Sequence, residues 1–465
     1  MIYIQDFYIK SLNFIYEKCG KHISENNKNR SMTALAFLMG VIFAIRRSEG
    51  YLPEVLRFGE IALSLMTMAC LILFIIASVD RPIKRVSNRS GFIYIYIVCA
   101  VCMLIAWLLH SVGKLEINIV MISFVMPAFY LVWNNRKDYA TLFKNISAGF
   151  IASMAVWLMA NFIFFPHAQY FRQGNNAYMG MSANENTLAM CMSGALICSI
   201  YMFSVTKGLS KYLYIALSAV FMGTIILTTA RASFLGAAVS ILAWLIYYIK
   251  NYVIGKNSRE NEILPLVILI VALFLSSYVT KGLMEIVGIE RADAETSTET
   301  EVYAPVHSPL GDKINTLTSG RLDLWQYHIK DPKIFGADYD EYWEKAHSEG
   351  VTLDAHNSTI GITYRFGYLA GISFLLIQAF AIWFVIKAIF MRKPLPDKKI
   401  EGRRRRRDIK SSDYKSFVVL GVTMFCSAGI VESLEVMSRW MVTMIFYFSL
   451  TPMFCRECKN HARSN

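Results

Sequence analysis

The chain has 465 residues, of which 55% are hydrophobic and only 17% are charged, and its formal net charge is +13. Soluble domains carry about a quarter charged residues, so this sequence is poor in charge rather than merely rich in leucine. The composition excludes a disordered chain, a collagen and a disulfide-rich secreted scaffold, and the long uncharged stretches exclude a row of soluble domains. The sequence therefore predicts a membrane protein that crosses the bilayer many times.

Uncharged segments long enough to span a bilayer recur along most of the chain. A helix needs about 20 mainly apolar residues to cross the hydrocarbon core, where its internal hydrogen bonds satisfy the backbone. Twelve segments qualify, of which the first and the last two are short: 32–45, 61–79, 91–109, 117–133, 146–165, 186–205, 212–230, 232–249, 264–280, 366–386, 416–431 and 441–455. The predicted fold class is all-α and polytopic, with about twelve transmembrane helices and one large, mainly helical external loop.

The distribution of lysine and arginine predicts the orientation of these helices. Most basic residues, including the run Arg403–Arg407, fall on one side if the N-terminus is cytoplasmic. We therefore expect both termini in the cytoplasm, a transmembrane bundle of nine helices over 1–280, and an external loop domain over 281–357. Residues 358–465 would form the C-terminal transmembrane helices around a basic cytoplasmic loop, 391–415. The positive charge thus reflects topology, and no nucleic-acid partner is expected.

Several classes of site have no support in the sequence. Asp, Glu, Lys and Arg are absent from the middle of the first nine predicted spans, which argues against a transporter or a proton pathway. The pair Cys455 and Cys458 lacks a second pair of zinc ligands, and the external histidines lack metal-binding spacing. There is no phosphate-binding or dinucleotide glycine motif. We expect no metal, no cofactor and no disulfide framework.

Two arginines on the external side are candidate anion-binding residues. Arg231 is a single charge between two apolar segments, and Arg321 begins a predicted short helix whose apolar residues recur at helical spacing. A guanidinium binds phosphate oxygens through two parallel hydrogen bonds, so two arginines facing one pocket would suit a pyrophosphate. The alternatives are that Arg231 merely snorkels at a tight hairpin and that Arg321 pairs with a carboxylate such as Asp323.

His356 is the candidate proton acceptor, because it lies where the external loop re-enters the membrane. An imidazole can accept a hydroxyl proton near neutral pH. A lone histidine is more often structural, and Asp354 is the alternative base. The sequence lacks the G-x-S-x-G motif, so a serine hydrolase is not favoured.

Taken in order and on one side of the membrane, these motifs resemble those of the O-antigen ligase family. This family belongs to a superfamily that also holds O-antigen polymerases and bacterial protein O-oligosaccharyltransferases. The matching motifs are Gly180–Asn186, where Glu185 replaces a proline, Thr229–Ser233, Gly320–Trp325 followed by Ile334–Gly336, and His356–Ser358 followed by Gly367. Ala370 departs from the ligase signature, which has Gly, Thr or Tyr at this position, and so weakens ligase against polymerase.

The resemblance implies a function in lipopolysaccharide biosynthesis. The protein would be a metal-independent, inverting glycosyltransferase of the bacterial inner membrane, with its active site facing the periplasm. It would transfer a polysaccharide from undecaprenyl pyrophosphate to a sugar hydroxyl of lipid A–core. By resemblance His356, Arg231 and Arg321 would be catalytic. The residues expected to bind substrate are Arg172, Asn184, Asn186 and Asn357.

Two other functions stay open. One is an O-antigen or capsule polymerase of the same superfamily, in which the acceptor is another lipid-linked glycan. The other, with less support, is a polysaccharide transporter or flippase, which would need charged or discontinuous helices in the middle of the bilayer.

Overall fold

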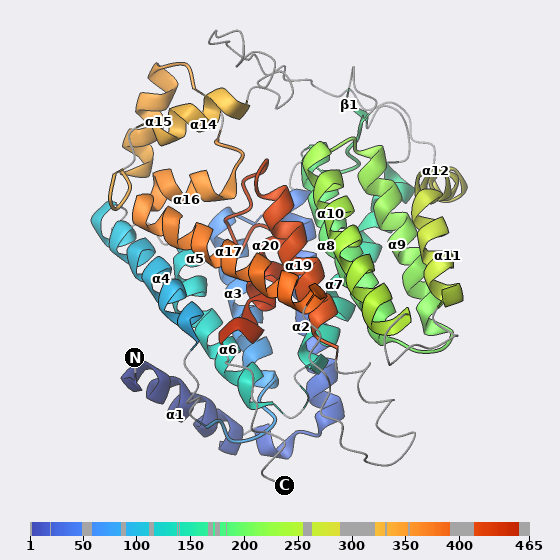
Figure 1. Cartoon of the computed structure of the whole chain (residues 1–465), viewed down its shortest axis with the longest axis horizontal. Coiled ribbons are helices and arrows are strands. Elements are labelled where there is room, and N and C mark those ends of the chain that lie inside the picture. The colour runs from blue at the N-terminus through green and yellow to red at the C-terminus, as the bar shows by residue number, and fades with distance from the viewer. Residues whose placement is uncertain are drawn as a thin grey trace.

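The protein is a bundle of long helices with a small group of shorter helices at one end (Figure 1). The computed structural model describes residues 2–18, 20–48, 58–84, 90–110, 116–136, 138, 140–165, 171–172, 177–182, 184–253, 263–288, 321–330, 333–351, 354–390 and 413–454. In Figure 1, α1 lies at the end of the bundle opposite to α14 and α15.

The first half of the chain contains most of the long helices. Its elements are α1 (Ile2–Lys18), η1 (Gly20–His22), α2 (Glu25–Arg47), α3 (Glu60–Ala77), α4 (Gly91–His110), α5 (Ile117–Val120), η4 (Met121–Val125), α6 (Met126–Asn135), α7 (Ala140–Phe164), β1 (Phe171–Arg172), β2 (Ala177–Tyr178), α8 (Glu185–Val205) and α9 (Ser210–Leu227). The two short strands form an antiparallel pair.

The second half contains shorter and more broken helices. Its elements are α10 (Arg231–Tyr248), η6 (Ile249–Val253), α11 (Ile263–Phe274), α12 (Ser276–Val287), α14 (Arg321–Ile329), α15 (Tyr339–Ser348), α16 (Ser358–Phe366), α17 (Tyr368–Phe390), α19 (Lys415–Ala428), α20 (Met441–Ser449) and η8 (Thr451–Phe454).

Every one of the twelve segments predicted to span the membrane contains helix. Within the described ranges, nine helices are long and apolar enough to cross a membrane, and α19 and α20 are shorter apolar helices. The predicted fold class, an all-α polytopic membrane protein, is therefore confirmed. The nine cysteines include six described free thiols, all in helices: Cys70, Cys99, Cys102, Cys191, Cys198 and Cys426. The pair Cys455 and Cys458 lies outside the described residues.

The span predicted over 264–280 is broken into two helices. The chain bends by 68° between α11 and α12, and helix continues to Val287. The reason is a tertiary contact that local hydropathy does not contain. Gly223 of α9 has no side chain, and a Cβ there would collide with the Ser276 carbonyl and the Thr280 hydroxyl. The glycine lets the start of α12 cross close to α9.

The late span predicted over 366–386 corresponds to α17, which begins at Tyr368 after a break in the helix. α16 and α17 are separated by Gly367, whose φ of 89° is readily adopted only by glycine. A Cβ on Gly367 would meet the carbonyl of Ile334, and one on Gly336 would meet the carbonyl of Arg365. Two glycines thus let the turn after α14 press against the α16–α17 junction.

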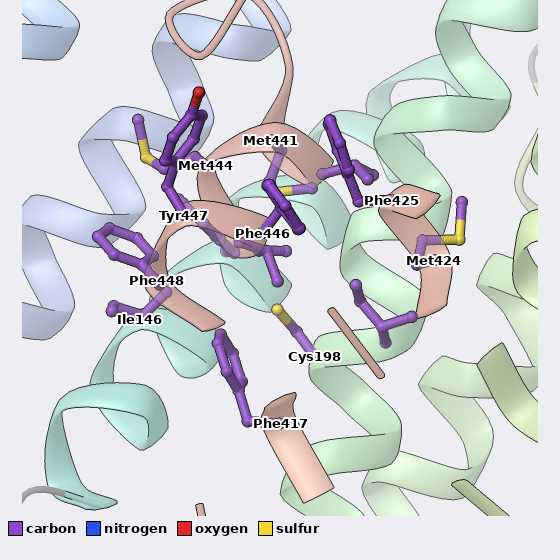
Figure 2. Packing of buried hydrophobic residues seen from close by; sticks show 14 of the residues in the cluster. Ile146, Cys198, Phe417, Met424, Phe425, Met441, Met444, Phe446, Tyr447 and Phe448 are labelled. Atoms are coloured by element: carbon purple, nitrogen blue, oxygen red, sulfur yellow. The ribbon is translucent and has the colours of Figure 1, made fainter. Parts of the chain in front are cut away.

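α8 is the central helix of the bundle, and its membrane-length window is entirely buried. α19 and α20 pack beside α8 and against each other, where the rings of Phe425 and Phe446 stack with 4.0 Å between their centroids (Figure 2). Figure 2 also shows Cys198 of α8 facing this cluster. Because α19 and α20 lie inside the protein, their apolar character reflects burial among other helices as much as contact with lipid.

Candidate active site

The segment between α19 and α20, residues 429–440, lies across the end of the bundle that carries α14 and α16. We call it the α19–α20 connection. Ser358, the first residue of α16, donates a hydrogen bond from its hydroxyl to the Glu432 carbonyl at 3.0 Å. Further along, buried Arg46 of α2 donates to the carbonyl of Ser438. The connection is therefore fixed at two points, and its acidic side chains are held between them.

The backbone of His356 is held on both sides by neighbouring elements. The Asn357 side chain caps α16 by accepting hydrogen bonds from two N–H groups of its first turn, and its amide donates to the Ile430 carbonyl at 2.9 Å. On the other side the indole N–H of Trp325 in α14 donates to the Ala355 carbonyl at 2.8 Å. His356 itself adopts φ 45°, a left-handed conformation that is uncommon for residues other than glycine. Such conformations persist where the surroundings impose them.

Arg321 and His356 converge on one carboxylate, that of Glu432. The distance from Arg321 Nη2 to Glu432 Oε2 is 3.7 Å, and that from His356 Nδ1 to Glu432 Oε1 is 3.5 Å. The Glu432 side chain is only 10% exposed, whereas that of His356 is 28% exposed. The structure thus brings together two of the three predicted catalytic residues, through a third residue that sequence reasoning missed.

Two of these polar atoms have incomplete hydrogen bonding. His356 Nδ1 and Glu432 Oε2 are buried and form no hydrogen bond within the described ranges, because the ion-pair distances are too long. Buried polar atoms usually form hydrogen bonds, so buried atoms that lack them indicate a functional role for the residue rather than a contribution to stability. Catalytic hydrogen bonds in particular are often long before substrate binds.

Arg231 is the first residue of α10, after a turn in which Thr229 has a φ of 54°. Its side chain is exposed, and it makes no ion pair with any residue that the structure describes. A short turn thus joins the two apolar helices that the sequence predicted on either side of Arg231. An exposed, uncompensated guanidinium at a helix start is able to bind an anion.

The packing of α10 on α19 fixes the position of Arg231 along the long axis of the bundle. Ser240 donates a hydrogen bond to the Leu420 carbonyl at 2.8 Å, and a Cβ on Gly236 would lie 3.0 Å from Ala428. The two helices therefore run antiparallel, and positions earlier in α10 lie opposite later positions in α19. Continuing this register places Arg231 level with the start of the α19–α20 connection, at the same end of the bundle as Glu432.

A second carboxyl of the connection, Glu435, faces the next turns of α16. Its side chain is 4% exposed and lies 3.8 Å from Arg365, measured from Oε1 to Nη1. It also lies against Gly361, where a Cβ would be 3.0 Å from the carboxyl carbon. Burial and the nearby Asp354 raise the pKa of Glu435 to about 7. Arg365 also pairs with Glu116 at 3.7 Å, which ties α16 to the start of α5.

α14, α15 and α16 share a small core of aromatic rings. His328 is buried and hydrogen-bonded through Nδ1 to the Tyr342 hydroxyl, and its ring stacks on Tyr364 with 4.9 Å between centroids. The Tyr364 hydroxyl donates to Asp354 Oδ1 at 3.0 Å, and the same oxygen accepts from the Ala355 N–H. Asp354, the alternative base, is thus engaged in holding this core together.

Two of the predicted substrate-binding asparagines lie at the start of α8. Asn184 caps α8 by accepting a hydrogen bond from the Thr187 N–H at 2.9 Å, and Asn186 is half-buried in the first turn. Arg172 is part of β1, and its side chain lies outside the described part of the structure. No hydrogen bond or ion pair links the described asparagines 184 and 186 to His356.

The described residues define a multi-pass membrane protein with an Arg–Glu–His group at one end of the bundle. Residues 213–375 match the model of a family described as O-antigen ligase, which identifies this segment as belonging to that family. The predicted resemblance is thereby confirmed, and the matched segment contains Arg231, Arg321 and His356. Members of this family are glycosyltransferase-like enzymes that act on polysaccharide–lipid substrates in a membrane. No curated protein sequence matches the chain significantly.

Proposed function

We propose that the protein is an O-antigen ligase, which transfers a polysaccharide from undecaprenyl pyrophosphate to a sugar hydroxyl of lipid A–core. The observation that carries this proposal is the convergence of Arg321 and His356, both within the segment that matches the family, on Glu432, which follows that segment. A cation and a proton acceptor at one site are the two groups that such a transfer needs.

In this proposal the arginines stabilise the leaving group. The bond between the anomeric carbon of the glycan and the phosphate oxygen breaks, and negative charge develops on the pyrophosphate. Arg321 and Arg231 would donate hydrogen bonds to its oxygens, the kind of fixed electrostatic stabilisation that often contributes most to catalysis. The activated pyrophosphate ester supplies the leaving group, so the transfer needs neither a nucleotide nor a metal ion.

His356 would remove the proton of the acceptor hydroxyl as its oxygen attacks the anomeric carbon. Nδ1 faces Glu432, so a proton on Nδ1 is favoured by the carboxylate and Nε2 becomes the nitrogen that accepts the hydroxyl proton. Glu432 would therefore position the imidazole and fix its tautomer. Attack from the face opposite the pyrophosphate would invert the anomeric centre.

We further propose that the protein lies in the bacterial inner membrane with both termini in the cytoplasm. The Arg321–Glu432–His356 group and 281–357 would then face the periplasm. The location of α1 and of α14 at opposite ends of the bundle supports this topology (Figure 1). Reporter fusions at positions 300 and 400 should report opposite sides, and a fusion that placed 400 in the periplasm would overturn the orientation.

The direct test is transfer in vitro by purified protein, with lipid-linked glycan and lipid A–core, observed as a shift of the core band on a gel. Arg321→Ala should lower the transfer rate by about 10²–10³-fold, the usual cost of removing a preorganised donor. Arg321→Lys should recover only part of this loss, because a point charge lacks the bidentate fork. Lys330→Ala, in the same part of the chain but exposed, is the matched control. Wild-type protein that never modifies lipid A–core would refute the ligase proposal.

The second candidate is an O-antigen or capsule polymerase, and one observation favours it. Ala370 replaces a residue of the ligase signature and is fully buried near the start of α17. A deletion strain separates the two functions. Loss of a ligase leaves lipid-linked polymer unattached, whereas loss of a polymerase leaves core capped with a single repeat unit.

A further inference from the structure

α12 has three distinct faces, which the bend after α11 sets apart from the transmembrane helices. One face, formed by Ser276, Thr280 and Met284 at intervals of four residues, is buried. Thr280 donates a hydrogen bond to the Val220 carbonyl of α9 at 3.3 Å. Together with the close approach at Gly223, this contact fixes α12 against α9 by small polar residues.

The second face of α12 is apolar and uncovered. The side chains of Val279 and Ile286 are 46% and 82% exposed, and they lie on the same side of the helix, seven residues apart. The exposed apolar surface is continuous with α11, where Val271 is 49% and Phe274 is 81% exposed. In a chain with this many membrane-length helices, such a surface matches the apolar chains of lipid.

The third face is polar. Lys281 and Glu285 are both exposed and lie one helical turn apart, and Tyr278, 76% exposed, lies next to them. A helix that packs on one face, exposes apolar residues on a second and carries charges on a third is typical of a helix lying in the plane of a membrane surface. Tyrosine is also enriched at that level of the bilayer.

We propose that α12 is an interfacial helix that lies in the membrane surface, at the end of the bundle that carries α14. Its apolar face contacts lipid acyl chains, and Lys281 and Glu285 contact headgroups. The bend of 68° supports this position, because α11 packs along the membrane-length helix α9 and α12 turns away from that direction where it crosses Gly223. The charges of Lys281 and Glu285 compensate each other, so the attachment needs no anionic lipid.

The position of α12 also sets the depth of Arg231. Gly223, where α12 crosses α9, lies four residues before Leu227 at the end of α9, or about 6 Å along the helix axis. Arg231 follows after a short turn, at headgroup level. A diphosphate attached to a lipid chain would have its oxygens at this depth. The placement of α12 does not depend on the proposed transferase activity.

Spin labels at single cysteines test the proposal in the full-length protein, in phosphatidylcholine nanodiscs. The background would have its nine native cysteines replaced by alanine and retain the wild-type helical content. Collision rates with oxygen, which concentrates in lipid, and with a water-soluble nickel chelate are compared. We expect the logarithm of their ratio to be positive at 279 and 286, negative at 281 and 285, and both rates to be low at 280 and 284.

Two sets of reference positions calibrate the measurement. Labels at exposed Gln326 and Lys330 of the α14 region should report water, and labels at Val267 and Val271 of α11 should report lipid. A high nickel rate at 279 and 286 would overturn the proposal in favour of a helix in water. A ratio that changes steadily from 276 to 287, without helical periodicity, would overturn it in favour of a helix that continues across the bilayer.

Discussion

The two ends of the bundle use their charged residues differently. At the end near α1, Lys28 donates to the Val79 carbonyl at 2.9 Å, Arg136 pairs with Glu25 at 2.7 Å, and Lys250 donates to the Ile389 carbonyl at 2.7 Å. Lys28 and Lys250 thus satisfy carbonyl groups that a helix end leaves without partners, and Arg136 compensates a carboxylate.

At the end near α14, some charged residues, such as Arg46, form hydrogen bonds, but a group of buried polar atoms does not. Buried oxygens of Glu432 and Glu435, and Nδ1 of His356, form no hydrogen bond with the residues described. An unsatisfied buried group costs about 1–3 kcal/mol, so such an arrangement weakens the fold unless it serves a ligand. The comparison teaches that one end of the molecule is built for stability, and that the other keeps polar groups available for chemistry.

Among substitutions at the end that carries α14, replacing His356 should have the largest effect on the transfer rate. We expect His356→Ala to lower transfer by about 10²–10⁴-fold, the range that a general base supplies, while the lipid pyrophosphate donor still binds. His356→Gln should be nearly as inactive, because an amide can donate and accept hydrogen bonds but cannot take up a proton. Rates are measured by the gel shift and donor binding by a filter assay. Near-wild-type transfer by the Gln variant would demote His356 to a positioning residue.

Replacing Glu432 should have the next largest effect. Glu432→Gln keeps the shape but removes the charge that orients the imidazole, so we expect kcat to fall more than about 10-fold, part of the contribution of base catalysis. The KM for the donor should change little, because both arginines remain. Exposed Glu341→Gln in α15 is the matched control and should be neutral. A raised donor KM with unchanged kcat would instead place Glu432 in substrate binding.

The opposite end should respond in stability and not in activity. Lys28→Met keeps most of the buried stem but leaves the Val79 carbonyl without its donor, at a cost of about 1–3 kcal/mol. We expect a lower Tm in detergent and an unchanged transfer rate per folded molecule. Lys10→Met, exposed in α1, should change neither quantity. A loss of specific activity in the Lys28 variant would show that the two ends are coupled.

The smallest expected effect is a pH dependence of stability at Glu435. Its pKa in the folded protein, raised to about 7, exceeds that of an unfolded carboxyl, near 4.5. The folded state therefore binds more protons between these values, and wild-type stability falls as the pH rises through this window. Glu435→Gln does not titrate, so its Tm relative to wild type should increase by a few degrees from pH 5 to pH 8. A difference in Tm that is constant with pH would contradict this.

The sequence predicted the helices well, because length and apolar content decide whether a segment can cross a bilayer. It did not predict the bend after Leu275 or the break at Gly367, since both depend on contacts with distant residues, Gly223 and Ile334. In each case the backbone of another segment comes close to a glycine, and a hydropathy profile does not predict such a contact.

The candidate site was predicted only in part. Arg231 was identifiable as a single charge between apolar segments, Arg321 as the start of a predicted helix, and His356 by its place where the external loop re-enters the membrane. Glu432 lies 76 residues after His356 and was missed. One signal was present: Glu432 and Glu435 are two acids three residues apart, directly after a long uncharged segment. The prediction that Arg321 might pair within its own helix did not anticipate that partner, because only the folded connection brings Glu432 to it.

The attachment of the α19–α20 connection to α2 has a consequence for biosynthesis. Arg46 is made early and enters the membrane with one of the first helices, yet its partner Ser438 follows 392 residues later. During synthesis the guanidinium therefore has Ser64 of the neighbouring helix as a partner, but it lacks the Ser438 carbonyl until nearly the whole chain has been translated. Glu432 arrives only then, so a ribosome-bound chain lacks the carboxylate of the site until its last helices are inserted, and premature termination yields an incomplete site.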